Sequence, residues 1–174
     1  DRVVKLPDNI SYEQAAGMML KGMTVQYLLN RTFKVGKGTI ALIHAAAGGV
    51  GLLLCQWAAH LGARVIGVVS TPEKAAVARA NFERAGVADQ VEVLVGAALD
   101  TLPQLAERGE QFDFFFIDAD KENNTAYVDW AVRLAAPGAV IVVDNVTRMG
   151  RVLDPAADDL QAQGVRNMLE LLGN

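Results

Sequence analysis

The chain of 174 residues is long enough for one domain with a substantial core, and its 52% hydrophobic and 21% charged residues are typical of a globular protein. Its formal net charge of −4, with no basic clusters between the aromatic residues, argues against a nucleic-acid partner. No apolar run approaches the roughly 18 residues that a membrane span needs, and no signal-peptide pattern is present. The single cysteine, Cys55, excludes an internal disulfide, which fits a cytoplasmic location.

Five short apolar runs rich in β-branched and aromatic residues recur along the chain, with amphipathic stretches between them. The predicted strands are Thr39–Ala46, Arg64–Ser70, Gln90–Gly96, Phe112–Asp118 and Ala139–Asp144. Apolar strands that alternate with helices are typical of a parallel sheet covered on both faces. Right-handed crossovers then favour an α/β fold, a three-layer α/β/α Rossmann-like doubly wound sheet with the strand order 3-2-1-4-5.

Capping residues and breakers mark the helices between these strands. The predicted helices cover about Gly49–Leu61, Thr71–Ala85, Ala97–Arg108, Glu122–Ala135 and Pro155–Leu172. Pro103 is expected to distort or restart the third of them. A less regular lead-in is predicted to hold a short strand at Val3–Leu6, a helix capped by Ser11 and Gln14, and a second helix from Met18 to Asn30. We expect a single domain with a helical lead-in (1–38), a first half (39–78) and a second half (79–174).

A glycine-rich turn follows the first predicted strand and leads directly into a helix. It is a GxGxxG-type turn with Ala46 in the first glycine position, and its free N–H groups would hold phosphates at the helix start. At the end of the second strand, Ser70 and Lys74 replace the acidic residue that would bind the ribose of NAD, which favours NADP(H). The alternative is that Ser70 caps a helix and Lys74 is solvated. The candidate cofactor-binding residues are Ala46, Gly48, Gly49, Val50, Gly51, Ser70 and Lys74.

Polar residues with oxygen ligands follow the fourth and fifth predicted strands. Asp118 ends the fourth strand, and Asp144 and Asn145 end the fifth. Because the carboxyl ends of neighbouring parallel strands share one edge of a sheet, these side chains should converge there and would suit a hard cation such as Mg²⁺. Lys121 could then accept a proton from a hydroxyl substrate if its pKa were depressed. The alternative is that these residues cap helices and turns.

Residues 1–78 resemble the zeta-crystallin-like quinone oxidoreductases of the medium-chain dehydrogenase/reductase superfamily, through Ser11–Leu29, His44–Trp57 and Arg64–Ala76. The resemblance implies the start of an NADPH-binding Rossmann domain. That family also needs a separate substrate domain, for which the sequence has no counterpart. His44, just before the glycine turn, is expected to be a packed strand residue rather than a base.

Residues 79–172 resemble the cation-dependent O-methyltransferases of the caffeoyl-CoA and catechol type, through Arg79–Gly86, Phe112–Tyr127 and Ala139–Val152. The resemblance implies that Asp118, Asp144 and Asn145 are metal ligands and that Lys121 is the base. It also implies that Gly96–Ala98 borders the adenine of S-adenosylmethionine (SAM). The sequence departs from the family, which has its own glycine turn, an acidic residue where Ser70 stands, and a hairpin after the last helix.

The two resemblances together predict a chimeric, engineered Rossmann-like domain in which each site is incomplete. On this hypothesis the chain is not an enzyme and requires no cofactor, with weak NADP(H) binding at most and SAM and Mg²⁺ disfavoured. Lys121 and the three metal ligands would be remnants of a lost site. The alternatives left open are a residual NADP(H)-binding module, an active metal-dependent O-methyltransferase and an active NADPH quinone reductase.

The last predicted strand, Ala139–Asp144, is very apolar and would form one edge of the sheet. Exposed apolar edges pair with other chains. The sequence therefore predicts self-association, unless the lead-in or the last helix covers this edge.

Overall fold

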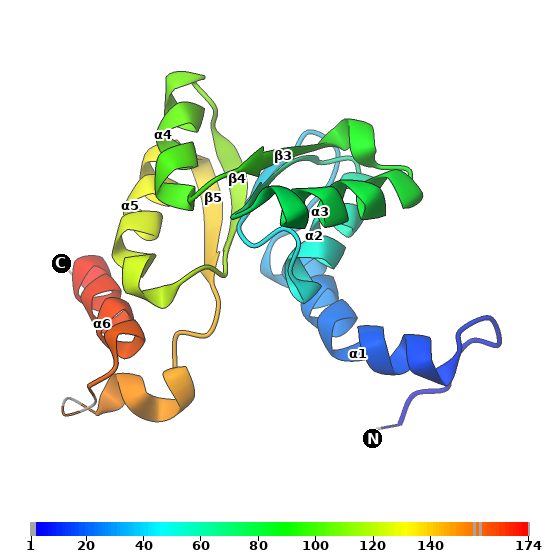
Figure 1. The fold of residues 1–174 in the computed structure, drawn as a ribbon, viewed down its shortest axis with the longest axis horizontal. Coiled ribbons are helices and arrows are strands. Elements are labelled where there is room, and N and C mark those ends of the chain that lie inside the picture. The colour runs from blue at the N-terminus through cyan, green and yellow to red at the C-terminus, as the bar shows by residue number, and fades with distance from the viewer. Residues whose placement is uncertain (1–2, 155, 157, 174) are drawn as a thin grey trace.

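The computed structural model, which describes residues 3–154, 156 and 158–173, contains one parallel sheet of five strands (Figure 1). The strands are β1 (Ile40–Ile43), β2 (Arg64–Val69), β3 (Val91–Val95), β4 (Phe112–Ile117) and β5 (Ala135–Val143). Their order across the sheet is β3-β2-β1-β4-β5, and every neighbouring pair is parallel. The predicted Rossmann-like topology is confirmed.

Helices follow the strands and cover both faces of this sheet (Figure 1). The α-helices are α1 (Tyr12–Tyr27), α2 (Gly49–His60), α3 (Pro72–Arg84), α4 (Ala98–Glu107), α5 (Asn124–Leu134) and α6 (Leu160–Gly173). Shorter turns are the π-helical η1 (Leu28–Thr32) and the 3₁₀ segments η2 (Ala88–Gln90), η3 (Lys121–Asn123) and η4 (Arg148–Leu153). The lead-in folds as one helix, α1, continued by η1, and Val3–Leu6 forms no strand.

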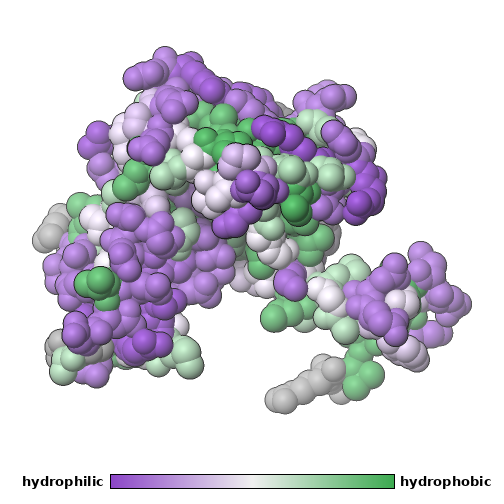
Figure 2. Space-filling model, in the orientation of Figure 1, coloured by the Kyte–Doolittle hydropathy of each residue, from purple (hydrophilic) through white to green (hydrophobic). Residues whose placement is uncertain are grey.

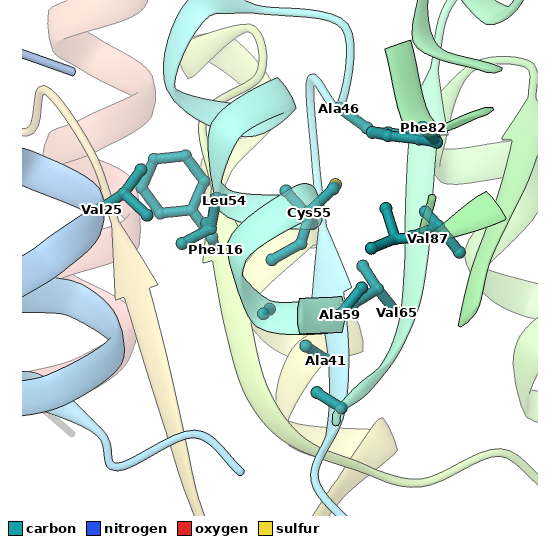
Figure 3. Close-up of a cluster of buried hydrophobic side chains, with 14 of the residues drawn as sticks. Val25, Ala41, Ala46, Leu54, Cys55, Ala59, Val65, Phe82, Val87 and Phe116 are labelled. Atoms are coloured by element: carbon teal, nitrogen blue, oxygen red, sulfur yellow. The ribbon is translucent and has the colours of Figure 1, made fainter. Parts of the chain in front are cut away.

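Two hydrophobic clusters hold the three layers together, one on each face. On the first face, side chains of α1, α2 and α3 pack on the sheet, as with Val25, Leu54 and Phe116 in Figure 3. On the second face, α4, α5 and α6 pack around a cluster that includes Phe112 and Phe115. Successive side chains of β4, such as Phe115 and Phe116, thus point to opposite faces of the sheet. Because both faces are covered, the sequence of this strand is almost continuously apolar.

Local sequence signals account for most helix boundaries. Ser11 and Gln14 form a capping box at α1, and the hydroxyl of Thr71 accepts the N–H of Lys74 at the start of α3. Two expectations were wrong. Pro103 lies inside a continuous α4, and α5 passes directly into β5 at Ala135. The predicted start of the last helix, Pro155, lies outside the described residues, and α6 begins at Leu160.

The surface is mostly hydrophilic on the face that Figure 2 shows, and the first part of α1 stands clear of the rest of the molecule (Figures 1 and 2). β5 lies at one edge of the sheet, and within the described residues it pairs only with β4. None of the described helices is long and apolar enough to cross a membrane.

Candidate functional site

A cavity of about 510 Å³ opens at the carboxyl ends of the strands, where open α/β sheets bind ligands. Segments after four different strands form its wall, so both halves of the chain contribute. The lining residues are His44, Ala45, Ala47, Gly48, Val68, Val69, Ser70, Lys74, Gly96, Ala97, Ala98, Asp118, Ala119, Asp120 and Tyr127. Gly96–Ala98, predicted to border an adenine, lies in this wall.

The glycine turn brings the backbone of the first half against the cavity. Gly48 is the N-cap of α2, and its N–H donates to the carbonyl of Ala45 over 2.7 Å. Gly51 is required by packing, because a Cβ there would lie 2.9 Å from the carbonyl carbon of Ala45 and closer still to its oxygen. Of the candidate residues in this turn, only Gly48 lines the cavity. The side chain of Ala46 is buried toward Gly67 instead.

At the end of β2, Ser70 and Lys74 both line the cavity. The ammonium group of Lys74 donates to the hydroxyl of Ser70 over 2.9 Å. Thr71 rather than Ser70 caps α3, so the alternative role of Ser70 as a helix cap is wrong. This end of the cavity therefore presents a positive charge and a hydroxyl, with no carboxylate among its lining residues.

The predicted oxygen ligands meet at the edge between β4 and β5. Ile117 and Val143 are register partners, and the N–H of Asp144 donates to the carbonyl of Ile117 over 3.0 Å, which places Asp118 and Asp144 on adjacent strand ends. Only Asp118 of the three candidates lines the cavity. Asn145 follows with φ of 57°, and its N–H donates to the Asp144 carboxylate over 2.7 Å. The described residues include no group of three or more His, Cys, Asp and Glu side chains arranged to hold a metal.

Lys121 is buried immediately beside these carboxylates. Its ammonium group lies 2.9 Å from Oδ1 of Asp118, and its side chain is only 5% exposed. α6 packs directly on the backbone here, because Gly164 brings it against Lys121 and Glu122. Lys121 is thus held beside Asp118 by an ion pair and by the packing of a distant helix, although it is not one of the cavity-lining residues.

A further group of cavity residues was not predicted from the sequence. Tyr127 of α5 donates its hydroxyl to Oδ1 of Asp120 over 2.5 Å, and its ring meets that of His44 edge-on at 5.3 Å. Burial and this hydrogen bond raise the pKa of Tyr127 well above its usual value. Burial favours protonation of Asp120, but hydrogen bonds from Tyr127 and Asn123 outweigh it and hold the pKa of Asp120 below its ordinary value. Only the short spacing of Asp118 and Asp120 could have indicated this group.

The fold and the cavity together define a Rossmann-like domain with a small-molecule site at the carboxyl ends of its strands. The model of the O-methyltransferase family matches residues 46–173, and the chain belongs to this family. It is 58% identical over 110 residues to a catechol O-methyltransferase of Mycobacterium tuberculosis, an alignment that covers 63% of this chain and 49% of that protein. It also matches the crystal structure of the Bacillus cereus O-methyltransferase in complex with SAH, with 38% identity, a TM-score of 0.72, and 97% and 72% of the two chains covered.

Another part of the chain matches a second family. It is 58% identical over 79 residues to a quinone oxidoreductase of Pseudomonas aeruginosa, covering 45% of this chain and 24% of that protein. Both resemblances expected from the sequence are therefore confirmed, and the chain has a hybrid character. The chain spans about half the length of the catechol O-methyltransferase it matches.

These findings contradict the expectation of an inactive engineered domain that is not an enzyme. The overturning findings are the match to the O-methyltransferase family, the catechol O-methyltransferase relative and the similarity to a structure solved with SAH. They also contradict the expectation that no cofactor is required, because the Bacillus cereus relative was solved with SAH, the demethylated form of SAM. The physical error was to treat the two halves as separate broken sites, whereas the glycine turn of one and the carboxylates of the other line a common cavity.

Proposed function

We propose that this chain is the donor-binding domain of a SAM-dependent O-methyltransferase. The observation that carries the proposal is the single cavity at the carboxyl ends of the strands, with the glycine turn on one side and Asp118 on the other. Membership of the family and similarity to an SAH-bound relative support the same assignment.

Most of the cavity wall suits SAM. Val69, Ala97 and Ala98 offer an apolar surface for an adenine ring, and the cavity volume is in the range of small-molecule sites. Asp118 and Asp120 place carboxylates where the positive sulfonium and ammonium groups of the donor would be stabilised. Ser70 can bond a ribose hydroxyl, whereas Lys74 adds a positive charge that the donor does not need. When bound, SAM supplies an electrophilic methyl group on a sulfonium.

A divalent cation fits the oxygen ligands of the adjacent edge. Asp118, Asp144 and Asn145 would hold it, since carboxylate and amide oxygens are the ligands that Mg²⁺ prefers. When bound, such an ion would polarise the oxygen of a hydroxyl substrate. The ion pair with Asp118 holds Lys121 beside this edge. With Asp118 bound to the cation and Lys121 deprotonated to the free amine, Lys121 would accept the hydroxyl proton, and we assign it that role.

The proposal is tested by measuring SAH formation from SAM and catechol in the presence of Mg²⁺, together with calorimetric binding of SAH. Asp144→Ala, which removes a ligand of the cation, and Lys121→Met, which removes the proton acceptor, should each lower turnover at least about 100-fold. SAH affinity should change little in Asp144→Ala, because Asp144 lies outside the cavity wall. Asp89→Asn, an exposed carboxylate at the amino end of β3, is the matched control. Absence of both SAH binding and methyl transfer in the unmodified chain would refute the proposal.

A further inference from the structure

The side chain of His44 is a buried polar group in the cavity wall that the proposed chemistry does not use. It follows β1, is 2% exposed and lines the cavity. Its backbone N–H donates to the carbonyl of Phe116, which fixes the chain at the end of the strand. Its Nδ1 is buried without a hydrogen-bond partner in the described structure. Buried polar groups without a partner are rare in proteins, and a ligand, an ion or an ordered water often supplies the missing hydrogen bond.

The neighbouring side chains do not satisfy the imidazole, because they are already paired with one another. The hydroxyl of Tyr127 donates to Asp120, and the ammonium group of Lys121 donates to Asp118. Tyr127 meets His44 only through an edge-on ring contact. The ring is therefore held firmly in place while its hydrogen-bonding capacity stays available to a ligand in the cavity.

The surroundings of His44 favour a positively charged donor group. Asp118 and Asp120 line this end of the cavity, whereas Lys74 lies at the other end, after β2. Burial lowers the pKa of His44 to about 4, so at neutral pH the imidazole is uncharged and one ring nitrogen keeps an acceptor lone pair. A ligand with an ammonium group and an adenosine would thus be oriented with the ammonium group toward β1 and β4.

We propose that His44 is a specificity-determining residue of the donor site, with a ring nitrogen that accepts a hydrogen bond from the α-ammonium group of the methionine part of SAM or SAH. This inference rests on the proposed function, since it takes SAM as the ligand. It assigns to His44 a ligand contact, where the sequence predicted a packed strand residue.

Two adenosine ligands separate this contact from general effects on the cavity. SAH carries the ammonium group, whereas 5′-methylthioadenosine has the same adenosine and thioether without it. In calorimetry, His44→Phe should weaken SAH about ten-fold or more, the usual effect of losing a hydrogen bond to a charged group, and should leave methylthioadenosine within about two-fold. His44→Gln, which restores an acceptor, should recover part of the SAH affinity. His60→Phe, on the exposed end of α2, is the matched control.

Nuclear magnetic resonance on the unmodified chain gives a measurement that does not depend on the folding of a variant. The chain has two histidines, so ¹⁵N-histidine labelling reports His44 and His60 alone. SAH should shift a ring nitrogen of His44 in the direction of a hydrogen-bonded acceptor, methylthioadenosine should not, and His60 should stay unchanged.

Each other outcome overturns a defined part of the reasoning. If SAH binds without moving the His44 signals, or if His44→Phe weakens both ligands equally, the inference is wrong and the proposed function stands. If neither ligand binds the unmodified chain at millimolar concentration, both the proposed function and the inference about His44 are refuted.

Discussion

Gly164 is the position where one methyl group should have the largest effect on how the second half of the chain is held together. A Cβ at this position of α6 would lie 2.6 Å from Cα of Glu122, and closer still to the carbonyl oxygen of Lys121. Real Cβ atoms essentially never approach below 3.0 Å, and backbone atoms cannot rotate away as a flexible side chain can. Gly164→Ala therefore forces α6 outward by at least 0.4 Å, the difference between these two distances.

The magnitude follows from two opposing effects. Overpacking of this kind costs about 1–3 kcal/mol, whereas replacing glycine by alanine inside a helix gains up to about 1 kcal/mol. The displaced helix also loosens the contacts of Ala162, Val165 and Met168, which are the buried face of α6. We expect a net loss of about 1–2 kcal/mol in the free energy of unfolding.

Urea denaturation followed by circular dichroism measures this change. Gly17→Ala is the matched control, because its Cβ would meet nothing within 4 Å and it also lies in a helix, α1. The control should be stabilised by up to about 1 kcal/mol. If Gly164→Ala is as stable as the unmodified chain, or more so, then α6 does not dock on η3 as described and the support of Lys121 by this helix is refuted.

Three further predictions concern pH, charge and association. Burial lowers the pKa of His44 from 6.5 to about 4, so the stability that the neutral imidazole contributes is present above pH 6.5 and is lost as the pH falls toward 4. The loss is up to about 1.4 kcal/mol per pH unit. Between pH 7 and pH 5, urea denaturation should therefore show a smaller loss of unfolding free energy in His44→Phe than in the unmodified chain. Lys74→Glu should raise the ratio of SAM affinity to SAH affinity about two- to five-fold in calorimetry, because SAM carries one more positive charge than SAH. The effect stays small because solvent partly screens the exposed side chain. The control Lys34→Glu should leave this ratio unchanged, and an unchanged ratio in Lys74→Glu would count against a role for Lys74. The β5 edge should cause concentration-dependent self-association in analytical ultracentrifugation, and a monodisperse monomer at high concentration would argue against an open edge.

The sequence by itself determined the topology, because the signals involved are local. Apolar runs mark each strand, and caps such as Ser11 and Thr71 mark helix starts. Chirality rules then leave few strand orders, and the predicted order 3-2-1-4-5 is the one that the structure has. The strand-end positions of Asp118 and Asp144 followed for the same reason, since parallel strands end at a shared edge. Local signals failed where tertiary contacts decide, as at Ala135, where β5 begins without an intervening turn.

Only the tertiary structure decided which of these residues share a cavity. Tyr127 lies on a helix with nothing in its sequence to distinguish it from a core residue, and it reaches Asp120 because α5 packs on the second face of the sheet. Ala46 occupies a position of the glycine turn yet points into the core, whereas His44, two residues earlier, lines the cavity. These orientations depend on packing between segments far apart in the chain, and a local sequence pattern does not show which distant segments come into contact.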